Sequence, residues 1–318
     1  MLRLRLTVGW SGLAMLLLTP SLWAEESARW LERMEQATRT QSYYGAYVYE
    51  RPGVFTTQNI WRKVDSTGVT ERLQQTAGRY QEWFRQDGQL RCTSSSARVV
   101  SSGTPILHVD PSGLNDWYSL RMLGGTMIAS RPVTVVSLTP RDAYRYAYEL
   151  YLDNETGLLL KSLLVDENRE LLERFQFASV TFDEPPAEDL QPSSACLTVE
   201  QNAELPQQRA NYWEPAWLPP GFSLGHQQVQ AIHGSELRIT SQIYTDGLAR
   251  FTLFVEPLGQ DGLAEDLRAQ LGPTVAVSRR LMTRDKLYLA TVVGEIPPMA
   301  AERIAESLND TLAGSKHD

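Results

Sequence analysis

The stretch YRYAYELYLDNETGLLLKSLLV, residues 144–165, decides the fold class of this 318-residue chain. Between Tyr144 and Leu152 large apolar side chains recur at every second position, which is the period of a β-strand with one buried face. The polar residues 154–157 can turn the chain, and a second apolar run then continues to Val165. The stretch therefore predicts an antiparallel hairpin.

Strand patterns continue on both sides of this hairpin. Residues 170–182 predict a third strand, and three consecutive strands with tight turns form a meander, the unit of sandwiches, barrels and open barrels. A helix capped by Ser27 and running to Ala37 is expected before the sheet. Further strands are expected at residues 43–49, 55–64, 69–75, 81–85 and 89–93. The N-terminal part is therefore predicted to be mostly β.

A second unit follows a change of composition. Residues 183–189 are acidic and rich in proline, so we expect an ordered tail tied back by Cys196, followed by a linker at residues 199–212. Beyond the linker we expect strands at residues 227–232, 238–244, 249–255, 275–281 and 287–293, a short helix at 263–271, and a final helix after Pro297-Pro298. The chain is thus predicted to be α+β, with one domain at residues 25–198 and a smaller one at 213–318.

The first 24 residues have the composition of a secretory signal peptide. Arg3 and Arg5 precede an apolar run from Val8 to Leu18, and the small residue Ala24 ends the cleavage region. The run is shorter than the ~20 residues that a transmembrane helix needs. We expect cleavage at Ala24 and export, with an uncleaved anchor as the alternative.

Export bears on the two cysteines of the chain, Cys92 and Cys196. An oxidising compartment favours a disulfide, and two cysteines allow one intramolecular connectivity. The chain-entropy model assigns ~4.7 kcal/mol to a bridge that closes a loop of about 100 residues. The alternative is a pair of unpaired buried thiols.

Charge and residue spacing argue against several classes of function. Acidic residues outnumber basic ones 38 to 30, and phosphate binding needs a basic face, so no nucleic-acid partner is expected. The four histidines are scattered without metal-ligand spacing, and no glycine-rich phosphate loop precedes a helix. We therefore expect no metal site and no cofactor.

One catalytic motif requires separate treatment. Residues 221–225 read GFSLG and match the G-x-S-x-G elbow of serine hydrolases, which needs a strand before the serine and a helix after it. Pro219 and Pro220 precede the motif and cannot donate to a central strand ladder, and residues 226–232 predict a strand. We expect no enzyme and no catalytic residue; an exported hydrolase remains an alternative that rests on this match alone.

Aromatic residues suggest a ligand-binding cleft in the N-terminal domain. In the strand at residues 44–50 one face carries Tyr47 and Tyr49, yet the opposite face is apolar as well, which a sheet covered on one side does not need. A curved sheet with a helix on one side and a cleft on the other explains both faces. The cleft candidates are Tyr47, Tyr49, Trp61, Trp83, Trp117 and Tyr118. An ordinary thick core is the alternative for each of them.

A basic cluster stands out in the second domain of this acidic chain. It consists of Arg279, Arg280, Arg284 and Lys286. Such a cluster can contact an anionic partner or a lipid phosphate, and the alternative is a solvated strand edge.

Several motifs together resemble the MucB/RseB family of periplasmic sigma-factor regulators, most closely its pseudomonad MucB branch. They are YYGAYVYER at residues 43–51, TPRD at 139–142, LLERFQF at 171–177, WLPPGF at 217–222 and YTDGLARF at 244–251. The resemblance covers essentially the whole mature chain, and the cysteine pair falls where that branch has one.

The resemblance implies an N-terminal open, curved sheet or half-barrel like the lipoprotein carriers LolA and LolB, with a smaller C-terminal α+β domain. It also implies a periplasmic negative regulator that binds the periplasmic segment of a MucA/RseA-like transmembrane anti-sigma factor. Such a regulator shields the segment from a site-1 protease and releases it on sensing lipid or lipopolysaccharide. A homo-oligomer is compatible with this role. The alternative is a lipid or lipoprotein carrier that uses the same cleft but does not need a second domain.

Overall fold

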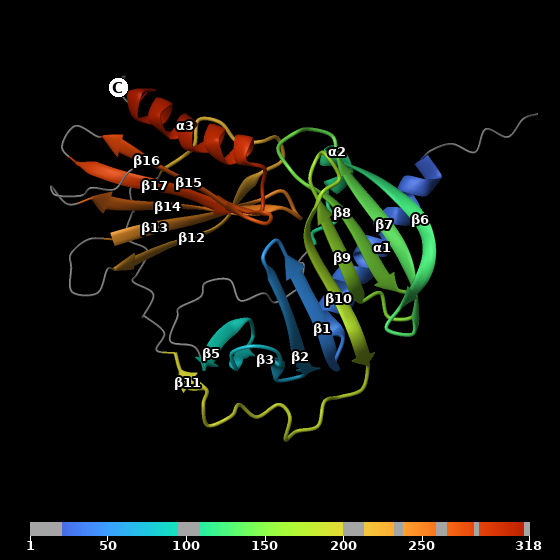
Figure 1. Ribbon diagram of the computed structural model, residues 1–318. Helices are drawn as coiled ribbons and strands as arrows, with labels where there is room; N and C mark the ends of the chain where they lie inside the picture. The colour runs from blue at the N-terminus through green and yellow to red at the C-terminus, as the bar shows by residue number, and fades with distance from the viewer. Residues whose placement is uncertain are drawn as a thin grey trace, which may run out of the picture.

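The computed structural model describes residues 21–94, 109–199, 213–231, 238–258, 266–282 and 286–314. These residues form two antiparallel sheets, one of 11 strands and one of 6 (Figure 1). Within the described residues, none of the helices is long and apolar enough to cross a bilayer. The predicted signal peptide lies mostly outside the described ranges, so cleavage at Ala24, a residue of the first helix, stays a prediction.

The larger sheet has the strand order β11-β5-β4-β3-β2-β1-β10-β9-β8-β7-β6. Its strands are β1 (Tyr43–Arg51), β2 (Val54–Asp65), β3 (Gly68–Gln75), β4 (Gln81–Gln86), β5 (Gln89–Thr93), β6 (Tyr118–Ile128), β7 (Arg131–Pro140), β8 (Ala147–Asp153), β9 (Leu159–Val165), β10 (Leu171–Thr181) and β11 (Leu197–Thr198). The hairpin predicted at residues 144–165 is confirmed as β8 and β9, with Tyr148 opposite Leu164. The sheet curves and does not close, because β11 and β6 are its two ends (Figure 1). The prediction of an open curved sheet is confirmed.

Helix α1 (Ser21–Thr40) packs against β6 of this sheet. Leu31 and Met34 on α1 are buried in the core of the N-terminal domain. Ser27, predicted as the helix cap, instead lies inside the helix and is 0% exposed. The prediction was wrong because positions 27, 31 and 34 share one helical face, and that face is the buried one. A second short helix, α2 (Leu114–Trp117), precedes β6.

The acidic tail at residues 183–196 is ordered and covers strands β3 to β5. Arg72 donates to the carbonyl of Asp189, and the buried carboxylate of Glu82 accepts hydrogen bonds from Arg72 and from the backbone of Ser193. Burial opposes ionisation of Glu82, but the hydrogen bonds from Ser193 and Arg72 outweigh it and lower the pKa of this carboxyl.

The tail is held by the predicted disulfide, which is confirmed. Cys92 on β5 is bonded to Cys196, with their Cα atoms 5.3 Å apart. Directly after the bridge, β11 pairs with β5. The end of the tail is thus fixed both covalently and by backbone hydrogen bonds.

The smaller sheet has the order β12-β13-β14-β17-β16-β15. Its strands are β12 (Ser223–Ala231), β13 (Arg238–Thr245), β14 (Arg250–Leu258), β15 (Leu267–Leu271), β16 (Thr274–Met282) and β17 (Leu287–Gly294). The predicted final helix is confirmed as α3 (Pro298–Gly314), which packs against β16 and β17. The linker predicted at residues 199–212 lies outside the described residues apart from Val199.

The short helix predicted at residues 263–271 is wrong for its described part. Leu267–Leu271 is strand β15, and Leu271 pairs with Thr274 across the turn at Gly272-Pro273. Gly272 has φ +58°, in the left-handed region that this two-residue hairpin turn requires. Leu267 and Leu271 fit the spacing of a helix as well as the alternation of a strand, so periodicity alone misassigned them.

Candidate functional site

One face of the six-stranded sheet is covered by α3, and its opposite face is apolar and partly exposed. Val277 and Val292 are buried in the same cluster as Ile304 and Leu308 of α3. Because successive side chains of a strand point to opposite faces, the residues that alternate with Val277 and Val292 face away from α3. We call this second side the outer face.

The outer face carries large apolar side chains on five neighbouring strands. Met282 is 78% exposed and Leu267 56% exposed, and both Leu271 and Ile243 are also exposed. Partly buried members of the face are Phe254, Leu287, Leu289 and Val293. A sheet that meets water on one side is normally polar there, and large exposed apolar patches mark interaction surfaces. The outer face is therefore a candidate binding surface.

The two domains meet at a buried ion pair. Arg145, just before β8, donates from Nη1 to Oδ2 of Asp246 at 2.8 Å, and both side chains are 0% exposed. Asp246 lies in the turn between β13 and β14, and it also accepts the phenol of Tyr118 and the backbone N–H groups of Leu248 and Ala249. Burial raises the pKa of Asp246, and these hydrogen bonds together with Arg145 oppose the rise.

Arg145 has further partners from both domains. Its Nη2 donates to the carbonyl of Pro220 at 2.5 Å and lies 3.0 Å from a carboxylate oxygen of Asp142. Its guanidinium also lies 5.3–5.6 Å from three aromatic ring centroids, those of Trp117, Tyr118 and Phe222. A charge held by this many groups fixes the junction in one geometry.

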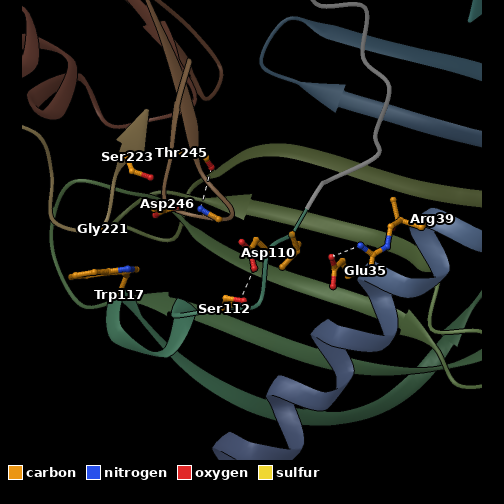
Figure 2. A pocket seen from close by; sticks show the side chains of 12 residues that line it. Glu35, Arg39, Asp110, Ser112, Trp117, Gly221, Ser223, Thr245 and Asp246 are labelled. Atoms are coloured by element: carbon orange, nitrogen blue, oxygen red, sulfur yellow. Dashed lines mark hydrogen bonds and ion pairs between the residues drawn. The ribbon is translucent and has the colours of Figure 1, made fainter. Parts of the chain in front are cut away.

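Next to this ion pair lies a cavity of about 520 Å³ between the domains (Figure 2). The N-terminal domain contributes the end of α1 together with Asp110 and Trp117, and the C-terminal domain contributes Ser223 and the turn at Asp246. The backbone N–H of Asp110 donates to the carbonyl of Gly247 at 2.7 Å, which joins the two walls. We call this cavity the junction pocket.

Gly221 shows how closely the two domains approach at this pocket. It has φ +86°, and a Cβ built on it would lie 2.2 Å from the indole of Trp117. Only glycine fits that position, because the turn needs the left-handed conformation and the indole leaves no space. The turn closes with Phe222 donating to the carbonyl of Pro219, and Ser223 then opens β12. A strand thus follows the serine where a hydrolase elbow needs a helix.

The six aromatic residues predicted for a lipid cleft do not come together at one surface. Tyr47, Trp83 and Tyr118 are buried in the core, and the phenol of Tyr47 donates to Gln58 at 2.6 Å. These three residues therefore follow the alternative of an ordinary core.

The other three cleft candidates lie in different places. Tyr49 is half-buried and donates to Glu173, whereas Trp61 lies on the opposite face of β2 from Gln58 and packs under Arg72. Trp117 lines the junction pocket. A role in lipid binding for Tyr49, Trp61 or Trp117 stays a prediction.

The basic cluster is divided by the strand geometry. Arg279 faces α3 and pairs with Glu306 at 2.9 Å, whereas Arg280 faces the outer side and lies 3.9 Å from Asp266. Lys286 directly precedes β17, and Arg284 lies outside the described residues. Adjacent arginines on one strand therefore do not form a single patch, because they point to opposite faces.

An open-sheet domain locked to a small α+β domain that presents an apolar face defines a two-domain binding protein. The chain belongs to the MucB/RseB family, because the N-terminal family model matches residues 26–205 and the C-terminal model matches residues 207–309. The resemblance seen in the sequence motifs is confirmed.

Individual relatives agree with this assignment. The chain is 42% identical to the sigma factor AlgU regulatory protein MucB of Pseudomonas aeruginosa, with 96% of this chain and 97% of the relative covered. It is 26% identical to the sigma-E factor regulatory protein RseB of Escherichia coli K12, over 87% of this chain and 89% of the relative. The crystal structure of MucB in complex with MucA(peri) superposes with a TM-score of 0.74 at 42% identity, covering 88% of this chain and 97% of that one.

Proposed function

We propose that this protein is a periplasmic regulator that binds the periplasmic segment of a MucA/RseA-like anti-sigma factor and thereby controls a sigma factor. The observation that carries the proposal is the exposed apolar outer face of the C-terminal sheet, as the described residues form it. Members of the family are named as sigma factor regulatory proteins, which fits a role in binding a regulatory partner. The relative crystallised with MucA(peri) supports the choice of partner.

The outer face supplies the driving force for such binding. Exposed side chains such as Met282 and Leu267 contribute about 25 cal/mol for each Å² of apolar surface that a partner covers. A segment held against this face is removed from the extended, accessible state that a protease cleaves. Binding and shielding from a site-1 protease are therefore one event in this proposal.

Release by lipid forms the second half of the proposed function. A lipid can displace the segment only if it binds the free or rearranged protein better than the complex. Export by the signal peptide at residues 1–24 would place the protein where both the segment and displaced envelope lipid occur.

The test is a titration of a labelled anti-sigma periplasmic segment against wild type and three single variants. Ile243→Glu and Met282→Glu place a charge on the outer face, and Met127→Glu does the same at a 58% exposed residue of β6 in the other domain. The two outer-face variants should each bind at least tenfold more weakly, because a factor of ten is only about 1.4 kcal/mol and burying an unpaired charge costs more than that. The control should bind normally. Equal binding by all four proteins would refute the outer face as the binding surface.

A further inference from the structure

We propose that the junction pocket receives a lysine or arginine side chain of the bound segment, with Asp110 and Trp117 as the recognising groups. The inference rests on the proposed function and adds which chemical feature of the partner is recognised. It is carried by the cavity and by the carboxylates and the indole that line it (Figure 2).

The pocket has an excess of negative charge. Its lining contains the carboxylates of Glu35, Asp110 and Asp246 but one guanidinium, that of Arg39. The last turn of α1 also contributes to the wall, but its Thr38 carbonyl already accepts a hydrogen bond from Arg62, so the negative charge of the pocket comes from the carboxylates. A cation entering this cavity is therefore favoured over an anion.

Two of the three carboxylates already have a cation. Asp246 is bonded to Arg145, and Glu35 pairs with Arg39 at 3.1 Å. Asp110 is exposed, and its Oδ1 accepts the backbone N–H of Ser112 at 2.9 Å. Among the described residues no cation lies within ion-pair distance of Asp110, so this carboxylate is the one available to a ligand.

The indole of Trp117 supplies the second recognising group. A cation within about 6 Å of a tryptophan ring gains roughly 0.5–2 kcal/mol, and Arg145 already lies 5.6 Å from this ring centroid. A volume of about 520 Å³ lies within the range of small-ligand sites and admits a long side chain with its water. Lysine and arginine combine the charge that Asp110 needs with an aliphatic stem that packs on a ring.

The test compares Asp110→Asn with Asp116→Asn. Asparagine at position 110 keeps the acceptor for the Ser112 N–H and removes only the charge. Asp116 is an exposed carboxylate of α2 that does not line the pocket, so it is the matched control. Each lysine and arginine of the segment is changed to glutamine in turn, and every peptide is titrated against all three proteins at low and moderate salt.

We expect Asp110→Asn to weaken binding roughly tenfold and to reduce its salt dependence, with Asp116→Asn near wild type. At one peptide position, the change to glutamine should cause no further loss of affinity for Asp110→Asn. That position identifies the side chain that enters the pocket. Affinity within twofold of wild type for Asp110→Asn, or the absence of any coupled position, would overturn the inference while the proposed function stands. No binding of the segment to the wild-type protein would overturn the proposed function itself.

A free polyamine has the same chemistry as these side chains, so spermidine alone is titrated as a separate arm. The inference is supported if spermidine competes with the wild-type peptide but not with the peptide that carries glutamine at the position coupled to Asp110. The pocket then recognises a side chain of the partner. Spermidine that binds in an Asp110-dependent way, while no peptide position couples to Asp110, assigns the pocket to a free amine and overturns the inference.

Discussion

Replacing Arg145 with methionine tests the junction directly. Asp246 would then be left 0% exposed without its cation, and the carbonyl of Pro220 would lose a donor. Breaking a buried ion pair by removing one partner costs about 3–5 kcal/mol, because the remaining charge stays desolvated. We therefore expect Arg145→Met to lower the free energy of unfolding by that amount, measured by urea titration followed through tryptophan fluorescence.

The loss should depend on pH in a definite direction. Burial already raises the pKa of Asp246, and removing Arg145 raises it further because the compensating charge is gone. A carboxyl with a raised pKa in the folded state stabilises the fold below its unfolded pKa, and this stability is lost as pH rises through the folded pKa. The deficit of Arg145→Met should thus be larger at pH 8 than at pH 5.

The double variant Arg145→Met/Asp246→Asn is the control for this argument. With neither charge present, its deficit should be smaller than the sum of the two single deficits and should not change between pH 5 and pH 8. A cost below 1 kcal/mol for Arg145→Met, or a deficit that is the same at both pH values, would refute the view that this pair locks the domains.

Three further changes have expected outcomes. Burial and the neighbouring carboxylate of Glu295 raise the pKa of Glu173 to about 7. Glu173→Gln should therefore match the wild-type melting temperature near pH 5 and exceed it at pH 8, and a difference in melting temperature that is the same at both pH values would contradict this. Cys92→Ser opens a bridge between residues 104 apart and should destabilise the N-terminal domain by at most ~4.7 kcal/mol in urea, whereas an unchanged midpoint would show that the bridge adds nothing. Ser223→Ala should retain protease protection of the segment, because a strand and not a helix follows this serine; a variant that binds the segment normally but fails in a turnover assay would reopen the hydrolase alternative.

The strands were predictable from sequence because alternation reports a half-buried strand directly. Residues 144–165 combine alternation with a polar turn, and the structure has the same hairpin there. Residues 267–271 failed because two leucines four apart satisfy both periods, and only pairing with β16 decides between them. A local pattern therefore identifies a helix or strand where the residues fit only one period. It misassigns a segment whose residues fit both the helical and the strand period.

The candidate site was less accessible from sequence. Alternation places Tyr47 on one face of a strand but does not say whether a helix or solvent meets that face, and here the residue is fully buried. Arg145 and Asp246 are 101 positions apart, and no spacing rule connects a polar residue beside an apolar strand to a turn in another domain. Trp117 was predicted as a ligand-lining residue, and it does line a cavity, although that cavity lies between the domains.

The junction links the two halves of the proposed function. The turn that carries Asp246 connects β13 and β14, the strands that present Ile243 and Phe254 on the outer face, and the same turn forms one wall of the junction pocket. In the proposed function, a lipid bound to the N-terminal domain alters segment binding by shifting Trp117 and its partner Arg145 relative to this turn. The coupling free energy equals the difference between the free energies of lipid binding to the protein with the junction locked and with the junction shifted. Because the junction of Arg145→Met is already unlocked, this variant should bind the segment more weakly and should not respond to added lipid. If Arg145→Met still released the segment on lipid addition as the wild type does, lipid would act on segment binding by a route other than the junction.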